Sequence, residues 1–454
     1  MESIERGGVL NGAVIRGAVV AALGGFLLGF DTVVISGAND ALQKVFDLDS
    51  YWLGFTVAVA MIGTIVGAVV IGKPADLFGR KKALFALAIC YFVSAVGCGL
   101  SRDWWEFLAA RFIGGLAIGA SSVVSPMYIA EISPPRLRGR LVTVSQLNLV
   151  VGILLCYVSN YVIAQCVEFD AAWRWMLALA AFPSAVFFLL ILGISESPRW
   201  LVKVGRPDDA RRSLAQLGEK DIERELGAIQ ASLADRPGHA QDRLFQRAYL
   251  RPVLLASAFA VFNQLTGINA ILYYAPKIFS MAGATSDDAL LQSVAIGGTI
   301  LLFTIAAMFV IDRFGRRVLM LVGSAGMAAC LTLVAMEFSR NPDARRSSVL
   351  LASLLCHIAF FAFSQGSVIW VFISEIFPNA VRAKGQTLGW FIHWGMAATI
   401  TWRFPVIAEA SSAGAFGFFA AMMVVQLLFV WKIMPETKGG ALEDIEKRLR
   451  GNTP

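Results

Sequence analysis

Apolar residues gather along this chain into long blocks that short polar segments separate. A helix rises 1.5 Å per residue, so a block of about 20 residues crosses a hydrocarbon core roughly 30 Å thick. The pattern predicts an all-α membrane protein with twelve transmembrane helices. Their expected ranges are 17–37, 52–72, 83–100, 106–130, 140–164, 175–194, 252–280, 290–311, 318–338, 347–374, 385–408 and 412–434. The first block is long enough to span, so we expect it to remain as a helix and not to be cleaved as a signal peptide.

The longest polar segment divides the predicted spans into two groups of six. Within this segment, Pro207 begins a short predicted helix that Gly218 ends, and a second predicted helix follows with one apolar face. We interpret both as solvated helices that pack under the bundle. The predicted organisation is a six-helix bundle at 1–194, a cytoplasmic linker at 195–251, a second six-helix bundle at 252–434 and a cytoplasmic tail at 435–454.

Composition and charge agree with a membrane protein, since 57% of the residues are hydrophobic and 16% are charged. With the N-terminus inside, 30 of the 39 Lys and Arg residues fall in cytoplasmic segments, as the positive-inside rule requires. The exceptions are Lys44, Arg102, Arg174, Lys277, Arg340, Arg345 and Arg346 outside, and Arg111 and Arg403 within spans. We expect a multi-pass protein of a bacterial-type inner membrane with both termini in the cytoplasm. This bias accounts for most of the net charge of +7 without a nucleic-acid partner.

Signals for two other protein classes are missing from the sequence. No GxxxxGK[ST] segment is present, which argues against an ATP-driven pump. The six cysteines and three histidines lack metal-ligand spacing, and no nucleophile constellation accompanies them. We therefore expect neither an enzyme nor a metal or cofactor site.

The two halves repeat each other in their cytoplasmic loops. DLFGRKK at Asp76 returns as DRFGRRV at Asp312, 236 residues later. AEISPPRLRG at Glu131 returns 244 residues later as SEIFPNAVRA at Glu375, and SESPRW at Glu196 is echoed 240 residues later by PETKGG. Two parallel six-span halves with a substrate site between them are typical of secondary transporters that work by rocking.

These motifs, together with QLTGINAILYYAP in the seventh predicted span, resemble the sugar porters of the major facilitator superfamily over nearly the whole chain. The pattern is most similar to bacterial proton-coupled symporters of xylose, galactose and arabinose. The resemblance implies a major facilitator fold of two six-helix halves, and a monosaccharide and a proton as the transported species.

Acidic and basic residues recur together in the cytoplasmic loops, where Arg80 and Arg316 are expected to pair bidentately with carboxylates. In the sugar porters such a network stabilises the outward-facing state. The resemblance implies this role for a cytoplasmic charge network of Arg80, Glu131, Arg138, Glu196, Arg316, Glu375, Arg382 and Glu436. The alternative is that these arginines only follow the positive-inside rule.

Asp31 is a carboxylate in the interior of the first predicted span, roughly 9 Å from its outer end. Arg111 has a similar depth in the fourth span, so an ion pair is expected between them. If Asp31 alternates between Arg111 and a proton, protonation is coupled to transport; the alternative is a permanent structural pair. Proton-coupled sugar porters carry Asp in this GFDT-like position and passive relatives carry Asn, so the resemblance favours symport.

A sugar site needs amides for the hydroxyls and aromatic rings for the C–H surface. The seventh span offers such polar groups near mid-membrane, and Gly267 and Pro276 are able to interrupt its helix. The candidate sugar-binding residues are Gln146, Asn263, Gln264, Asn269, Tyr273, Trp370, His393 and Trp394. Of these, Gln146, Gln264, Asn269, Trp370 and Trp394 match positions that contact sugar in family members. The alternative is that they only pack helices together.

Some positions depart from the family pattern. Asn263 replaces a Gln, His393 replaces a Gln or Asn, and Ala180 stands where some members carry a Glu. The segment SQGSVIW lacks the prolines that are common before this Trp, which leaves open how the tenth span bends. His393 either bonds to the sugar or titrates and adds to coupling.

The sequence thus predicts a monomeric importer of a monosaccharide with a proton, working by alternating access. A proton-independent facilitator and a transporter of a polyol such as inositol remain alternatives of the same fold.

Overall fold

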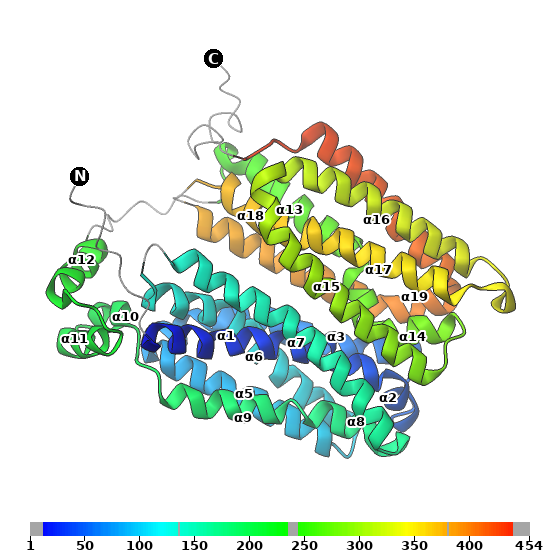
Figure 1. Cartoon of the computed structure of the whole chain (residues 1–454), viewed down its shortest axis with the longest axis horizontal. Helices are drawn as coiled ribbons and strands as arrows, with labels where there is room; N and C mark the ends of the chain where they lie inside the picture. Colours follow the sequence, from blue (N-terminus) through cyan, green and yellow to red (C-terminus); the bar gives the residue numbers. More distant parts are fainter. Residues whose placement is uncertain (1–11, 135–136, 235–243, 379–380, 439–454) are drawn as a thin grey trace. The chain divides into compact units, whose positions relative to one another are not determined.

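The computed structural model describes residues 12–134, 137–234, 244–378 and 381–438. Within these ranges the chain forms α-helices and short 3-10 helices, and no strand (Figure 1). The predicted C-terminal tail lies outside the described residues from 439 onward, as do linker residues 235–243.

The first six predicted spans are all helical. The helices are α1 (Gly12–Val34), η1 (Ile35–Ala38), α2 (Asn39–Val45), α3 (Ser50–Val70), α4 (Gly72–Phe78), α5 (Arg80–Leu100), α6 (Trp104–Ile132), α7 (Arg138–Cys166), α8 (Phe169–Ala178) and α9 (Ala181–Leu192). The sixth span is divided between α8 and α9, and the short helix α4 follows the second span.

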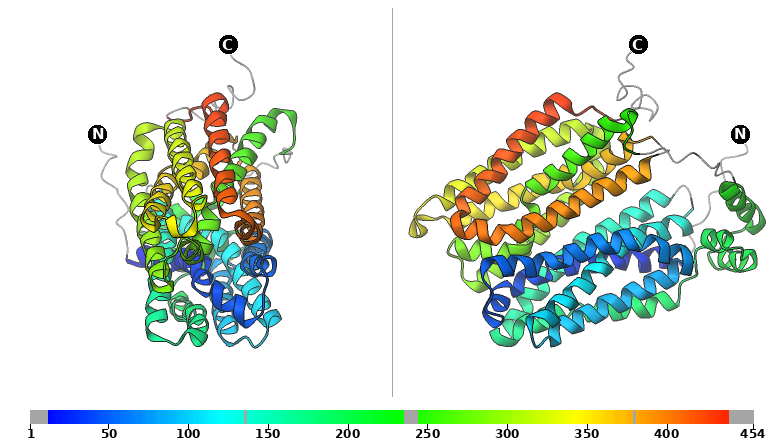
Figure 2. Two further views of the ribbon diagram at one scale, coloured as in Figure 1. Left: turned by 90° about the vertical axis from the view of Figure 1, so that its right-hand side faces the viewer. Right: turned by 180° about the vertical axis from the view of Figure 1, so that it is seen from behind.

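The linker contains three short helices, which are α10 (Pro198–Lys203), α11 (Pro207–Gln216) and α12 (Ile222–Ala234). As predicted, Pro207 is the first residue of α11, and Gly218 beyond its end has a positive φ of 78°. Trp200, Leu214 and Leu226 form a small apolar cluster that holds the three helices together. Both Figures 1 and 2 show them as a separate group of short helices.

The second six predicted spans are also helical, and two of them are broken. The helices are η2 (Arg247–Tyr249), α13 (Leu250–Leu265), α14 (Ile268–Met281), α15 (Ser286–Phe314), α16 (Arg316–Phe338), η3 (Pro342–Ala344), α17 (Ser347–Phe363), α18 (Gln365–Ile376) and α19 (Arg382–Ile433).

The last helix, α19, contains two spans. Its 52 residues would measure about 78 Å as one straight helix, more than twice the hydrocarbon thickness. At Ser411 the backbone is extended, with φ −165° and ψ 101°, and the chain turns back there. In Figure 2 the final red part of α19 runs alongside its orange first part. The described residues therefore contain eleven helical segments of spanning length, the last of which supplies the eleventh and twelfth predicted spans.

The seventh span breaks where the sequence predicted an interruption. Gly267 separates α13 from α14 and has a left-handed backbone, with φ 76°. A Cβ atom at this position would lie 2.6 Å from the Phe419 ring, so both the backbone and the packing require glycine. A second departure from helical geometry occurs at Tyr274, two residues before Pro276.

The chain groups into two compact units that differ from the sequence halves. One contains Met1–Thr32, Gly63–Ile153 and Leu177–Gly238; the other contains Val33–Ile62, Leu154–Met176 and His239–Pro454. The first unit has an apolar core drawn mainly from α1, α5, α6 and α9. The second has a core drawn from α13, α16, α18 and α19.

Candidate functional site

Asp31 and Arg111 form a buried ion pair in the first unit. Arg111 Nη1 lies 3.1 Å from Asp31 Oδ1, and the side chains are 1% exposed for Arg111 and 8% exposed for Asp31. Asp31 lies in the last turn of α1 and Arg111 in the second turn of α6. The structure thus brings together the two charges whose similar depth predicted a pair. Pairing is the expected way to hold both charges away from water.

The second carboxylate oxygen of Asp31 has different surroundings from the first. Among the described residues, Oδ2 accepts no hydrogen bond, although it is buried. Gly114 on α6 lies beside it, and a Cβ atom at Gly114 would be 3.5 Å from Oδ2. This oxygen therefore has acceptor capacity that no described neighbour uses.

The break in the seventh span positions a polar cluster in the second unit. Gln264, at the end of α13, accepts a hydrogen bond from Asn269 Nδ2 of α14 (2.8 Å). Its Nε2 donates to Asn263 Oδ1 (3.1 Å) and lies 3.0 Å from Nδ1 of His393 on α19. Four of the candidate sugar-binding residues are therefore joined through one amide. Such a cluster presents amide and imidazole groups of the kind that bind hydroxyls.

Aromatic rings lie beside this cluster. Trp370 of α18 stacks on Trp390 of α19 with ring centroids 4.0 Å apart, and His393 lies edge-on to Trp370 at 5.0 Å. Trp394 is buried and lies edge-on to His393. Sequence reasoning missed Trp390. Its spacing of three and four residues from His393 and Trp394 places all three on one helical face, and that spacing could have revealed it.

The two remaining candidate sugar-binding residues are Tyr273 and Gln146. Tyr273 lies one turn beyond Asn269 along α14 and is buried. Gln146 is an exposed residue of α7 in the first unit. The roles of these two residues in sugar binding stay predictions.

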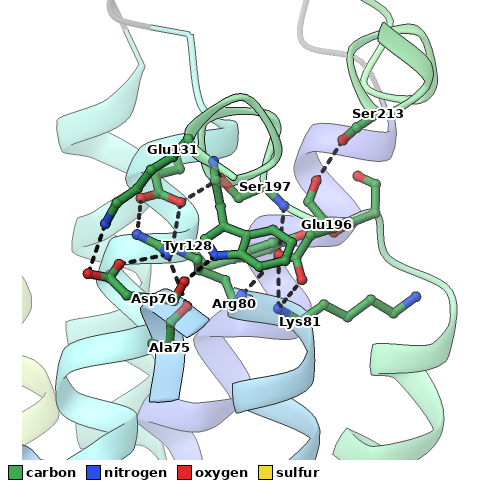
Figure 3. Close-up of polar contacts among 12 residues, drawn as sticks. Ala75, Asp76, Arg80, Lys81, Tyr128, Glu131, Glu196, Ser197 and Ser213 are labelled. Atoms are coloured by element: carbon green, nitrogen blue, oxygen red, sulfur yellow. Dashed lines mark hydrogen bonds and ion pairs between the residues drawn. The ribbon is translucent and has the colours of Figure 1, made fainter. Parts of the chain in front are cut away.

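The first-half part of the cytoplasmic charge network is assembled around Arg80, the first residue of α5 (Figure 3). Arg80 pairs with both oxygens of Glu131, with Nε–Oε2 and Nη2–Oε1 distances of 2.9 Å. Glu196 accepts backbone N–H bonds from Arg80 (3.0 Å) and Lys81 (3.1 Å) and thereby caps α5. A carboxylate at this place is stabilised by the free amides and the helix dipole.

The second half repeats this arrangement. Arg316 Nη2 lies 3.0 Å from Glu375 Oε1, and Glu436 accepts the backbone N–H groups of Arg316 and Arg317 at 3.0 Å each. Ser197 bonds to Glu131 and Thr437 bonds to Glu375 in the same way. The internal repeat thus extends from the sequence to individual hydrogen bonds.

The recurring glycine of this motif has a clear physical reason. Gly79 and Gly315 both have positive φ, 98° and 86°. A Cβ atom at Gly79 would lie 2.3 Å from Glu196 Oε2, and one at Gly315 would lie 2.7 Å from Glu436 Oε2. Glycine is therefore needed for the turn and for the approach of the capping carboxylate.

The two capping carboxylates differ electrostatically. Burial raises the pKa of the half-buried Glu196 above its usual value of 4.5, even though backbone amides bond to it. Burial also acts to raise the pKa of Glu436, but this side chain is exposed, and the backbone amides of Lys438, Arg317 and Arg316 lower its pKa below 4.5.

The two remaining residues of the network, Arg138 and Arg382, are the first residues of α7 and α19. Arg382 Nε donates to the carbonyl of Phe377 at 3.2 Å. Arg138 begins α7, and its side chain lies outside the described part of the structure. The joint role of the eight residues in stabilising one transport state stays a prediction.

Comparisons with known proteins agree with this architecture. The family described as sugar (and other) transporter matches residues 17–449. The chain is 36% identical over 442 residues to the arabinose-proton symporter of Bacillus subtilis (strain 168), covering 96% of this chain and 95% of that protein. It is 35% identical over 468 residues to the D-xylose-proton symporter of Escherichia coli (strain K12), covering 94% of each.

A solved structure is similar over the same length. The xylose transporter XylE from E. coli in its inward open conformation matches with a TM-score of 0.84 and 33% sequence identity, covering 96% of this chain and 99% of that one. The matches in sequence and fold together show that the chain is a multi-pass transport protein of the sugar transporter family, with the major facilitator fold, and not an enzyme.

Proposed function

We propose that this protein imports a monosaccharide together with a proton by alternating access across a bacterial cytoplasmic membrane. The observation that carries the proposal is the buried Asp31–Arg111 pair, whose second carboxylate oxygen has no donor among the described residues. Relatives named as arabinose- and xylose-proton symporters support both the substrate class and the coupling. In this proposal the chain works as a monomer. The bias of its Lys and Arg residues supports an orientation with both termini in the cytoplasm.

Asp31 acts as the proton carrier. While it is ionised it pairs with Arg111, and when Oδ2 takes a proton the carboxyl becomes neutral and the attraction to Arg111 is lost. Release of Arg111 then accompanies the change between outward- and inward-facing states. The amide, imidazole and tryptophan groups around Gln264 bind the sugar. The cytoplasmic charge network stabilises the state in which the cytoplasmic side is closed.

The experiment is uptake into proteoliposomes of labelled xylose, arabinose, glucose, galactose and inositol. With one proton per sugar, a gradient of two pH units supports at most about 100-fold accumulation, because each pH unit corresponds to a factor of ten. Asp31→Asn is expected to abolish this accumulation while sugar counterflow continues. Wild-type uptake that stops at equal concentrations inside and outside, with or without the pH gradient, would instead identify a facilitator, and uptake of inositol alone would identify a polyol transporter.

A matched control is available in the second unit. Glu337 is also a buried acid near the end of a span, and it pairs with Arg340 at 3.2 Å. Glu337→Gln removes a buried negative charge without touching Asp31. It is expected to leave gradient-driven accumulation intact. Equal loss of coupling in both variants would show that removal of either buried acid disrupts coupling, and the specific assignment of Asp31 would then be wrong.

A further inference from the structure

Two prolines lie inside membrane-spanning helices of the second unit, Pro276 in α14 and Pro405 in α19. Proline has no backbone N–H, so the carbonyl four residues earlier loses its helical donor. The carbonyls concerned belong to Leu272 and Thr401. In a membrane interior such groups need another partner, because no lipid atom can donate to them.

Each of these carbonyls accepts a bond from a buried tyrosine. Tyr157 of α7 donates its hydroxyl to the carbonyl of Leu272 at 2.6 Å, and Tyr274 of α14 donates to that of Thr401 at 3.0 Å. Both tyrosines are 1% exposed. The two hydrogen bonds are therefore chemically alike: a fully buried phenol supplies the donor that a proline removed.

Two further side chains from the first six spans bond to this part of α14. Asn39, the first residue of α2, donates Nδ2 to the carbonyl of Tyr273 at 2.8 Å and is 1% exposed. Lys277 donates in turn to Gln43 of α2 at 2.7 Å. The backbone next to the irregular residue Tyr274 is thus held from α2 as well as from α7.

The tyrosine bonds differ in which sequence halves they join. Tyr157 and Asn39 belong to the first six spans, and Leu272 and Tyr273 belong to the seventh. Tyr274 and Thr401 both belong to the second six spans. In alternating access the two halves separate at one end of the molecule while they close at the other. The bonds that Tyr157, Asn39 and Lys277 make between the halves have to break in such a movement, whereas the bond of Tyr274 does not.

We propose that Tyr157 and Asn39 are positioning residues of an extracellular gate, which they close by bonding to the backbone carbonyls of α14 beside Pro276. The inference rests on the proposed alternating access and orientation, which put these residues near the outer end of their spans. When the gate opens, water replaces the tyrosine and the asparagine as donor. The fraction of molecules that face outward then depends on the equilibrium between two states. In one the carbonyls of α14 bond to Tyr157 and Asn39, and in the other they bond to water.

The test measures this fraction directly. Spin labels are attached to Asp47→Cys and Asp343→Cys, two exposed positions on loops expected outside, in a chain whose six native cysteines are replaced. Distances are recorded by electron–electron double resonance without sugar. Tyr157→Phe and Asn39→Leu are expected to raise the ratio of the long to the short distance population on the order of five- to ten-fold, as the loss of one buried hydrogen bond allows.

The controls remove equivalent bonds within one half. Tyr274→Phe deletes the phenol that bonds to Thr401, and Asn160→Leu deletes a buried amide that donates to the carbonyl of Val34 at 3.1 Å. Both are expected to lower thermal stability about as much as the test variants, with no change in the distance ratio. A shift in all four variants, or in none, would overturn the gate. Failed sugar uptake with a shift in the test variants alone would refute the proposed function and leave the gate standing.

Discussion

Gln264 uses both ends of its amide, and this fixes the chemistry of its neighbours. An amide nitrogen only donates, so a ring nitrogen of His393 has to accept this bond, with Nδ1 at 3.0 Å and Nε2 at 3.3 Å. Gln264 Oε1 accepts from Asn269 at the same time. A sugar hydroxyl that enters the cluster therefore meets groups whose donor and acceptor roles are already assigned.

Replacement of Gln264 by Ala should strongly weaken sugar binding. The variant loses a proposed partner of the sugar and also leaves Asn269 and His393 without the amide that bonds to them. We expect the dissociation constant, measured by calorimetry in detergent, to rise on the order of ten-fold or more. The control is Gln426→Ala on the same helix as His393, because Gln426 is a fully buried amide that bonds to Gln365 and not to the cluster. Unchanged affinity in Gln264→Ala would remove this cluster from the sugar site.

Individual residues were predictable from the sequence when one local rule was enough. The depth of Asp31 and Arg111 within their spans predicted the pair that the structure shows. The bond from Gln264 to His393 and the stacking of Trp370 on Trp390 were not predicted. These contacts depend on how the seventh, tenth and eleventh spans pack together, and no local pattern in the sequence encodes that packing.

At the scale of single helices, the tenth span bends without the prolines that are common there in the family. The break between α17 and α18 is at Ser364, with φ −114° and ψ −86°. Its hydroxyl donates to the carbonyl of Phe360, one turn earlier, at 2.6 Å. A serine that bonds back in this way competes with the helical ladder and favours a bend. The sequence contained this residue, but its effect is visible only when the neighbouring helix leaves room for the bend, as Gly323 of α16 does.

The capping carboxylates of α5 and α16 should respond to pH in opposite directions. The lowered pKa of Glu436 means that its stabilisation of the folded protein is present above pH 4.5 and is lost as the pH falls through the folded-state pKa. For Glu196 the pKa is raised, so its contribution is largest at low pH and declines as the pH rises above 4.5.

Melting temperatures of Glu436→Gln and Glu196→Gln between about pH 3.5 and 7, a range that brackets the usual pKa of a glutamate, test this contrast. The difference between wild type and Glu436→Gln should shrink as the buffer is acidified, whereas that for Glu196→Gln should grow. Each variant serves as the control of the other, since both lie at the same place in the internal repeat. Parallel trends would show that the greater burial of Glu196 does not govern its titration.

For the whole molecule, the sequence predicted the number of spans from the long apolar blocks, and it predicted the internal repeat from the recurring loop motifs. The division into compact units was not predicted. Residues 33–62 and 154–176 of the first six spans group with the second half. The bonds from Asn39 and Tyr157 to α14 are part of this grouping, and they join residues 234 and 115 positions apart. The local sequence pattern of residues 33–62 and 154–176 does not predict such bonds.

Cys166 is a natural reporter of how the molecule is oriented. It is exposed at the end of α7, and the distribution of Lys and Arg predicts that this loop lies outside the cell. A membrane-impermeant maleimide should therefore label intact cells, and Cys166→Ser should remove most of the signal. Cys356 is also exposed, but it lies within α17, where lipid excludes the charged reagent.

The matching inner position is Ser232, an exposed residue of α12 in the linker. In a Cys166→Ser background, Ser232→Cys should react only after the membrane is permeabilised. The reverse pattern would place the termini outside and Asp31 near the cytoplasmic face. A proton taken up at Asp31 would then come from the cytoplasm, against the gradient that drives uptake, so this labelling experiment tests the direction of transport as well as the topology.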